Sequence, residues 1–247
     1  PAIVGIYYVA QQVASLPQKL KTSFDPILGP VITQNLEAGN KRAIARQVRQ
    51  VGFWIIAAQI AIALSLSIPG KAVMGLVGHS FVGGTGALAV LLAAEAIAAT
   101  AVVSEAALIY VAKLRNLAIS IAMIVVQALM SIASVHAIRM LRPVDDPTDD
   151  PIAAAGPAVA LMLALGLAAI VKSRLLSRIL GAPVSGWRWS LIWASLAAGT
   201  VGWLVTRLPH RFEWAELIFG VPLILASYGV VIWYFGFGEE DRELFRL

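Results

Sequence analysis

Long runs of apolar residues are the feature that most constrains how this chain folds. A run of about 20 such residues can cross the hydrocarbon core of a bilayer as a helix. Because lipid offers no hydrogen bonds to an exposed backbone, such segments form helices that satisfy their own backbone groups. We therefore expect an all-α polytopic bundle, one transmembrane domain over residues 1–247. Its seven or so helices are predicted at residues 3–36, 50–68, 84–112, 116–140, 152–180, 188–206 and 213–236.

Composition supports a membrane protein. Hydrophobic residues make up 59% of the chain and charged residues 13%, about half the charged share of a soluble domain. The net charge is +5, but in so apolar a chain Lys and Arg serve as topology signals and lipid anchors, so nucleic acid is not an expected partner. The chain has no cysteine, which excludes disulfides and thiolate metal sites.

The predicted span at residues 3–36 is long and contains Pro17, Pro26 and Pro30. Proline removes a backbone donor and clashes with the preceding turn, so we expect this span to be kinked.

The positive charges predict an orientation. Twelve of the 19 Lys and Arg residues fall on one side of the threaded spans, five fall on the other, and Lys19 and Lys21 fall inside the first span. The richer side should be cytoplasmic, which places the C-terminus in the cytoplasm of a cell whose inner (plasma) membrane holds the chain. Seven spans that end in the cytoplasm begin outside. We therefore expect an odd number of preceding spans, and interpret the chain as the C-terminal half of a longer transporter.

Polar residues on the first span form a candidate substrate site. At 100° per residue they fall within an arc of roughly 120°, with Lys21 flanking it. Charges inside the hydrocarbon are costly, so such a stripe faces away from lipid. A water-filled cavity is the favoured interpretation; a buried Lys–Asp pair or lysines that snorkel to the interface are the alternatives. The candidate substrate-binding residues are Gln11, Ser15, Gln18, Lys19, Lys21 and Thr22.

Two carboxylates are candidates for ion coupling. Asp25 follows the polar stripe, and Glu95 lies in the third span. An intramembrane carboxylate is a proton- or cation-coupling candidate by default. Glu105 is also in the third span, but it lies nearer the cytoplasmic end and is the weaker candidate. The fourth span has small and amide side chains on one face, which we interpret as helix packing: Asn116, Ser120, Gln127, Ser131 and Ser134.

No motif indicates an enzyme, a metal site or a cofactor. The chain has no phosphate-binding loop, no His-Glu-x-x-His and no Gly-x-Ser-x-Gly. Its histidines, His79, His136 and His210, lack ligand spacing. A membrane-embedded transferase would need a carboxylate cluster. The only dense one, Asp145 to Asp150, is better interpreted as a solvated turn.

Short motifs along the chain carry a resemblance to a known family. They resemble the eighth helix, the next helical hairpin and the cytoplasmic tail of polysaccharide and lipid II flippases. These flippases belong to the multidrug/oligosaccharidyl-lipid/polysaccharide exporter superfamily. The motifs are Gly5–Ala10, Leu16-Pro17, Pro30–Ile32, Glu37–Lys41, Val103–Glu105 with Leu114–Asn116, and Glu240–Leu244.

The resemblance implies a fourteen-helix protein of two lobes, with this chain as helices eight to fourteen. It implies alternating access around a central cavity, with Lys19 and Lys21 placed to attract a pyrophosphate. The expected function is to flip an undecaprenyl-pyrophosphate-linked oligosaccharide for cell-surface polysaccharide synthesis, such as lipopolysaccharide or exopolysaccharide. The expected partners are the bilayer, that lipid and the missing N-terminal lobe. Asp25 and Glu95 keep an alternative open, a proton- or sodium-coupled multidrug or cation exporter of the same fold.

Overall fold

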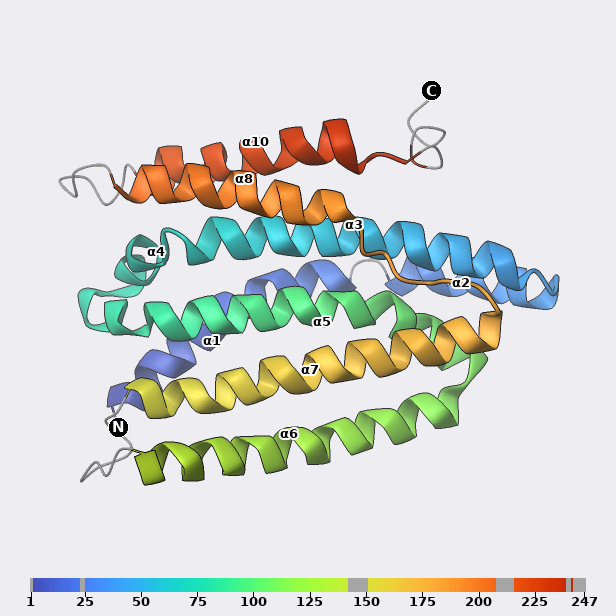
Figure 1. Cartoon of the computed structure of the whole chain (residues 1–247), viewed down its shortest axis with the longest axis horizontal. Coiled ribbons are helices and arrows are strands. Elements are labelled where there is room, and N and C mark those ends of the chain that lie inside the picture. Colours follow the sequence, from blue (N-terminus) through green and yellow to red (C-terminus); the bar gives the residue numbers. More distant parts are fainter. Residues whose placement is uncertain (1, 23–24, 142–150, 208–215, 239–240, 242–247) are drawn as a thin grey trace.

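A computed structural model shows the arrangement of the chain (Figure 1). It describes residues 2–22, 25–141, 151–207, 216–238 and 241. Within these ranges, side chains are described except at 2–3, 18–22, 25–28, 138–139, 141 and 151–157.

Every regular element formed by the described residues is a helix. Two short π-helical segments, η2 (Glu216–Gly220) and η3 (Ile232–Gly236), flank α10, and a 3₁₀ helix, η1 (His79–Gly84), precedes α5. The α-helices are α1 (Ala2–Thr22), α2 (Asp25–Glu37), α3 (Lys41–Ser67), α4 (Gly70–Val77), α5 (Thr85–Val111), α6 (Lys113–Leu141), α7 (Pro151–Leu180), α8 (Trp189–Thr206) and α10 (Val221–Val231).

The predicted all-α membrane bundle is confirmed. The described residues contain six helical segments long and apolar enough to cross a bilayer: Lys41–Ser67, His79–Val111, Lys113–Ala137, Ala158–Leu180, Trp189–Thr206 and Glu216–Gly236. The first predicted span is divided into two helices, α1 and α2, and neither is among these six segments. Pro17 and Pro30 lie within these helices, whereas Pro26 is the second residue of α2. In the first turn of a helix the missing N–H of proline is tolerated.

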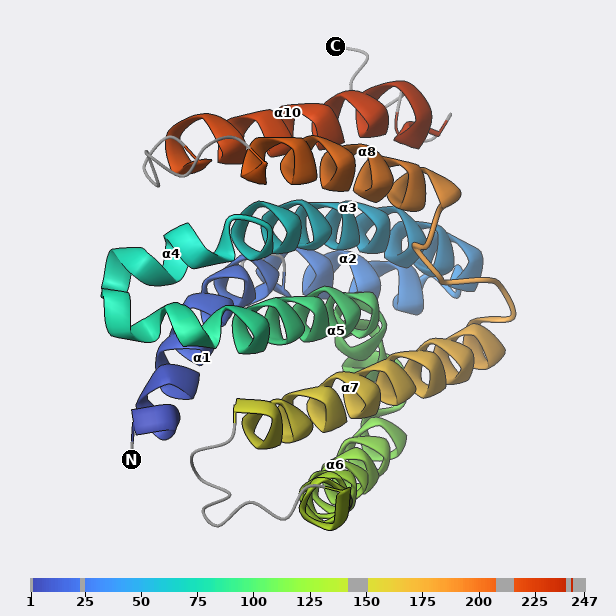
Figure 2. The same ribbon diagram turned by 60° about the vertical axis from the view of Figure 1, so that its left-hand side comes forward.

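The helices pack around α5. It contacts α3 on one side and α7 on the other, and α6 lies against α7. α8 and α10 form a pair that packs on α3. The first part of α1 projects past α5, whereas its second part and α2 pass behind α5 and α3 in both views (Figures 1 and 2).

One end of the bundle carries most of the described cations, and we call it the basic end. α3 begins there, α5 passes into α6 there, and α7 ends there. Its exposed cations include Lys41, Arg42, Lys113, Arg115 and Arg178. The turn between α2 and α3 fits its sequence, because Gly39 adopts a φ of 68° and the Asn40 side chain accepts a hydrogen bond from the N–H of Ala43.

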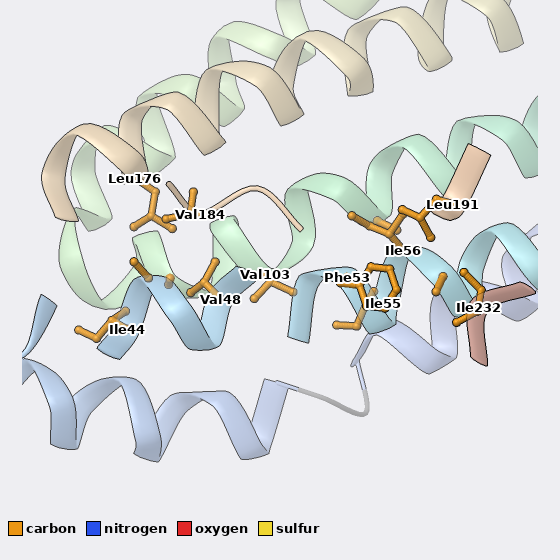
Figure 3. Close-up of a cluster of buried hydrophobic side chains, with 14 of the residues drawn as sticks. Ile44, Val48, Phe53, Ile55, Ile56, Val103, Leu176, Val184, Leu191 and Ile232 are labelled. Carbon is orange, nitrogen blue, oxygen red and sulfur yellow. The ribbon is translucent and has the colours of Figure 1, made fainter. Parts of the chain in front are cut away.

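The larger of two buried clusters surrounds the half of α3 nearest the basic end (Figure 3). Val48 and Phe53 of α3 pack among side chains from α5, α7, α8 and η3, including Val103, Leu176, Leu191 and Ile232. The segment between α7 and α8 approaches the α3 backbone very closely at Gly186. A Cβ there would lie 2.4 Å from the backbone nitrogen of Phe53. This contact fixes where the α8–α10 pair meets α3.

Candidate functional site

The predicted polar face of α1 is described over its first half. Ala10 and Ala14 are buried against the bundle, whereas Gln11 and Gln12 are exposed. Ser15 is half-buried, and its hydroxyl donates to the carbonyl of Gln12 across 2.7 Å. This half of the face thus places two amide side chains on the outer surface of the bundle, next to the exposed Tyr8.

The other candidates of this face lie where only the backbone is described. Gln18, Lys19, Lys21 and Thr22 are in the last turns of α1, and Asp25 is the first residue of α2. Their side chains lie outside the described residues, so a common arc of lysines and hydrogen-bonding groups stays a prediction.

Gln59 connects α1 to α3. It is 1% exposed, and its Nε2 donates to the carbonyl of Pro17 across 2.6 Å. Its Oε1 is buried and has no hydrogen-bond donor among the described residues. Gln59 was not among the candidates predicted from the sequence. The sequence does mark it, because Gln59 is an amide in the middle of the apolar run Ile55–Leu66, where polar groups are costly.

Glu95 lies inside the bundle, as the coupling hypothesis requires. It is on α5 and is 9% exposed. Glu95 follows Leu91 and Leu92 by one helical turn, so it shares their face of α5. These leucines pack with Ala14 of α1 and Ala63 of α3. Glu95 therefore faces α1 and α3.

A buried lysine joins three helices near the basic end through an ion pair and a hydrogen bond. Lys172 of α7 lies 2.8 Å from Oε1 of Glu105 on α5 and donates to the hydroxyl of Ser120 on α6 across 3.0 Å. The Lys172 side chain is 6% exposed and that of Glu105 is 43% exposed. From the sequence, Lys172 counts only as one of the twelve cations on the richer side of the membrane, whereas in the structure its ammonium points into the bundle. Glu105 serves as its counter-ion.

The C-terminal tail is fastened by a second buried carboxylate. Asp241 is fully buried. Its Oδ1 accepts hydrogen bonds from Gln50 and Trp54, each across 3.1 Å. Its Oδ2 accepts from Arg188 across 2.6 Å and from the N–H of Gly238 across 2.9 Å. Burial alone would raise the pKa of Asp241, but the hydrogen bonds from Arg188, Gly238 and Gln50 outweigh it and lower the pKa.

Aromatic rings enclose this network. The guanidinium of Arg188 lies 4.0 Å from the centre of the Phe53 ring. Trp54 packs edge-on against Phe237 at 5.1 Å between ring centres. The sequence predicts only a cytoplasmic end for this tail, because nothing in its local sequence reveals the partners on α3.

The remaining candidates add no reactive cluster. His79 and His136 are exposed, and His210 and the acidic loop lie outside the described residues. Within the described part of the chain, no group of three or more His, Cys, Asp or Glu side chains is placed to hold a metal ion. No family model, curated protein or solved structure matches the chain.

Proposed function

We propose that the chain is part of a membrane transporter, and that it flips a polyprenyl-pyrophosphate-linked oligosaccharide across the inner membrane. The observation that carries this proposal is the outer face of α1. In a bundle whose other long helices expose mainly apolar side chains, α1 exposes Gln11 and Gln12 beside Tyr8. Amide groups in a lipid-facing position are costly, so this face is suited to a polar cavity.

The chemistry of the cargo follows from what α1 carries. Amides and a phenol bond to sugar hydroxyls as donors and acceptors. Lys19 and Lys21, further along the same helix, supply positive charge for a pyrophosphate at a depth where water screens charge weakly. The resemblance to polysaccharide flippases supports the same cargo, and it supplies a second lobe to close the cavity. On this proposal the basic end faces the cytoplasm.

Replacing the two lysines tests the proposal. A Lys19→Ala/Lys21→Ala variant, expressed in the native cell at the normal level, should stop export of the oligosaccharide while the protein remains in the membrane. A Lys41→Ala/Arg42→Ala variant is the matched control, since it removes two exposed cations at the basic end. Full export by the lysine variant would refute the assignment of these residues.

The buried carboxylate supports a second candidate function. Glu95 is 9% exposed within a membrane-length helix, which suits a proton- or sodium-coupled exporter of drugs or cations. That function predicts transport that depends on an ion gradient and is lost in Glu95→Gln, with no change in the cell's lipid-linked sugars.

A further inference from the structure

The half-satisfied amide of Gln59 is an unusual group to find inside a membrane bundle. Its Nε2 is hydrogen bonded to the carbonyl of Pro17, but its Oε1 is buried without a donor in the described part of the chain. Buried acceptors are almost always paired, so an exception needs an explanation. The missing partner of Oε1 is a hydrogen-bond donor.

Glu95 lies at the same level of the bundle as this amide. Ile6 and Gly84 are in contact, since a Cβ on Gly84 would lie 2.6 Å from Cγ2 of Ile6. α1 and α5 both run from this contact toward the basic end. Pro17 lies eleven residues after Ile6 on α1, and Glu95 lies eleven residues after Gly84 on α5. Gln59 is bonded to that same Pro17. Because Glu95 also faces α1 and α3, its carboxyl group and the Gln59 amide approach the same interface.

We propose that Glu95 binds a proton, and that its carboxyl O–H then donates a hydrogen bond to Oε1 of Gln59. The proton comes from water, one O–H bond forms on Glu95, and no covalent bond in the protein breaks. The protonated carboxyl supplies the donor that Oε1 lacks. Gln59 keeps its bond to Pro17, so the proton on α5 is linked through one amide to the proline of α1. The inference concerns proton binding and holds for either cargo.

Charged and titratable groups on the neighbouring helices are placed as follows. On α5 and α7, Glu105 and Lys172 pair with each other ten residues beyond Glu95 along α5, about 15 Å away at 1.5 Å per residue. On α1, Lys19 is two residues beyond Pro17, and its side chain lies outside the described residues. Lys21 on α1 and Asp25 on α2 also have side chains outside the described residues. Further groups on the elements that pack on α5 lie toward the ends of those elements: Tyr7 and Tyr8 on α1, Glu37 on α2, Lys41, Arg42, Arg46 and Arg49 on α3, Lys71 on α4, His79 on η1, Lys113 and Arg115 on α6, and Arg174 and Arg178 on α7. Tyr110 lies near the end of α5 itself.

Infrared difference spectroscopy of the purified full chain in lipid tests this inference. Lowering the pH should produce a C=O band from a protonated buried carboxyl group. That band should disappear in Glu95→Gln and persist in Glu37→Gln, which removes an exposed carboxylate. In Gln59→Leu the band should remain and move to higher frequency, because the carboxyl O–H loses its acceptor. If Gln59→Leu does not fold, Gln59→Asn withdraws the acceptor by one methylene and should cause a shift in the same direction.

Three results would overturn the inference. The first is survival of the C=O band in Glu95→Gln. The second is an unchanged band frequency when Gln59 is replaced. The third is a band that appears when the Na⁺ concentration changes at constant pH, which would indicate that Glu95 binds a metal cation in place of a proton. Export is measured separately. If export refutes the flippase proposal while the Glu95 band behaves as expected, this inference still stands. If the Glu95 band fails the test while export behaves as expected, the flippase proposal still stands.

Discussion

Replacing Asp241 by Asn should release the C-terminal tail from α3. In the structure each carboxylate oxygen accepts two hydrogen bonds, Oδ1 from Gln50 and Trp54 and Oδ2 from Arg188 and Gly238. An asparagine has one acceptor oxygen and one NH₂ group. Whichever way it turns, its NH₂ group meets two donors, and Arg188 loses its counter-charge.

The magnitude follows from the burial of the pair. Removing one partner of a buried ion pair costs about 3–5 kcal/mol. Asp241 is fully buried but the Arg188 side chain is 24% exposed, so water can solvate part of the guanidinium. We therefore expect the lower end of this range, about 3 kcal/mol, which corresponds to roughly 100-fold in the equilibrium for opening the tail.

Amide hydrogen exchange measures that opening. In the purified protein, peptides covering residues 236–241 should exchange roughly 100-fold faster in Asp241→Asn, since exchange follows the free energy of local opening. Peptides from α5 should be unchanged. Glu37→Gln, which neutralises an exposed carboxylate at the C-terminal end of α2, is the control. Wild-type protection of the tail in Asp241→Asn would refute the reasoning that this carboxylate holds the tail.

Three further predictions follow from close contacts and buried charges. Gly186→Ala should lower the melting temperature and destabilise the fold by about 1–3 kcal/mol, because the new Cβ would lie 2.4 Å and 2.6 Å from backbone atoms of α3. Gly199→Ala should leave the melting temperature unchanged, since a Cβ there has nothing within 4 Å. Equal melting temperatures for the two variants would contradict the close packing at Gly186. Glu105→Gln should destabilise the protein more than Lys172→Met. It leaves without a counter-ion a lysine that is 6% exposed, whereas the glutamate left by Lys172→Met is 43% exposed. Melting of both single variants and the double variant measures their coupling, and additive effects would argue against the pair. The lowered pKa of Asp241 means that its contribution to tail docking is fully present above the ordinary pKa of 3.8 and is lost as the pH falls through the lower pKa of the folded state. Amide exchange rates corrected for intrinsic chemistry should therefore show a docked tail at pH 5. Release of the tail at pH 5 would contradict the hydrogen-bond network around Asp241.

The helices were predictable because their signals are local. The apolar run predicted at 84–112 corresponds to α5, Thr85–Val111, and the one at 188–206 to α8, Trp189–Thr206. α3 begins at Lys41, nine residues before the predicted span. Hydropathy marks where a helix enters the hydrocarbon, whereas Asn40 caps the helix further out, among exposed cations.

No helix was predicted between the spans at 50–68 and 84–112. Pro69-Gly70 and Gly83-Gly84 do break the chain direction there, but α4 forms over the eight residues Gly70–Val77. Its Val73 and Met74 are buried with Leu88 of α5, so tertiary packing stabilises a helix too short to be stable alone.

The buried polar groups could not be predicted, because each depends on a partner distant in sequence. Lys172 looks like an interfacial cation until α5 and α6 place Glu105 and Ser120 beside it. Asp241 lies 191 residues from Gln50, to which it is hydrogen bonded. Composition and spacing show that such groups are costly in a membrane, and only the packing of the helices shows what satisfies them.

The measurement that tests the proposed function most directly is mass spectrometry of lipid extracts after the gene that encodes this chain is depleted in its native cell. The account predicts accumulation of a polyprenyl-pyrophosphate-linked oligosaccharide on the cytoplasmic side, reversed by the wild-type gene and not by the Lys19→Ala/Lys21→Ala variant. An unchanged pool of lipid-linked sugars would contradict the flippase proposal.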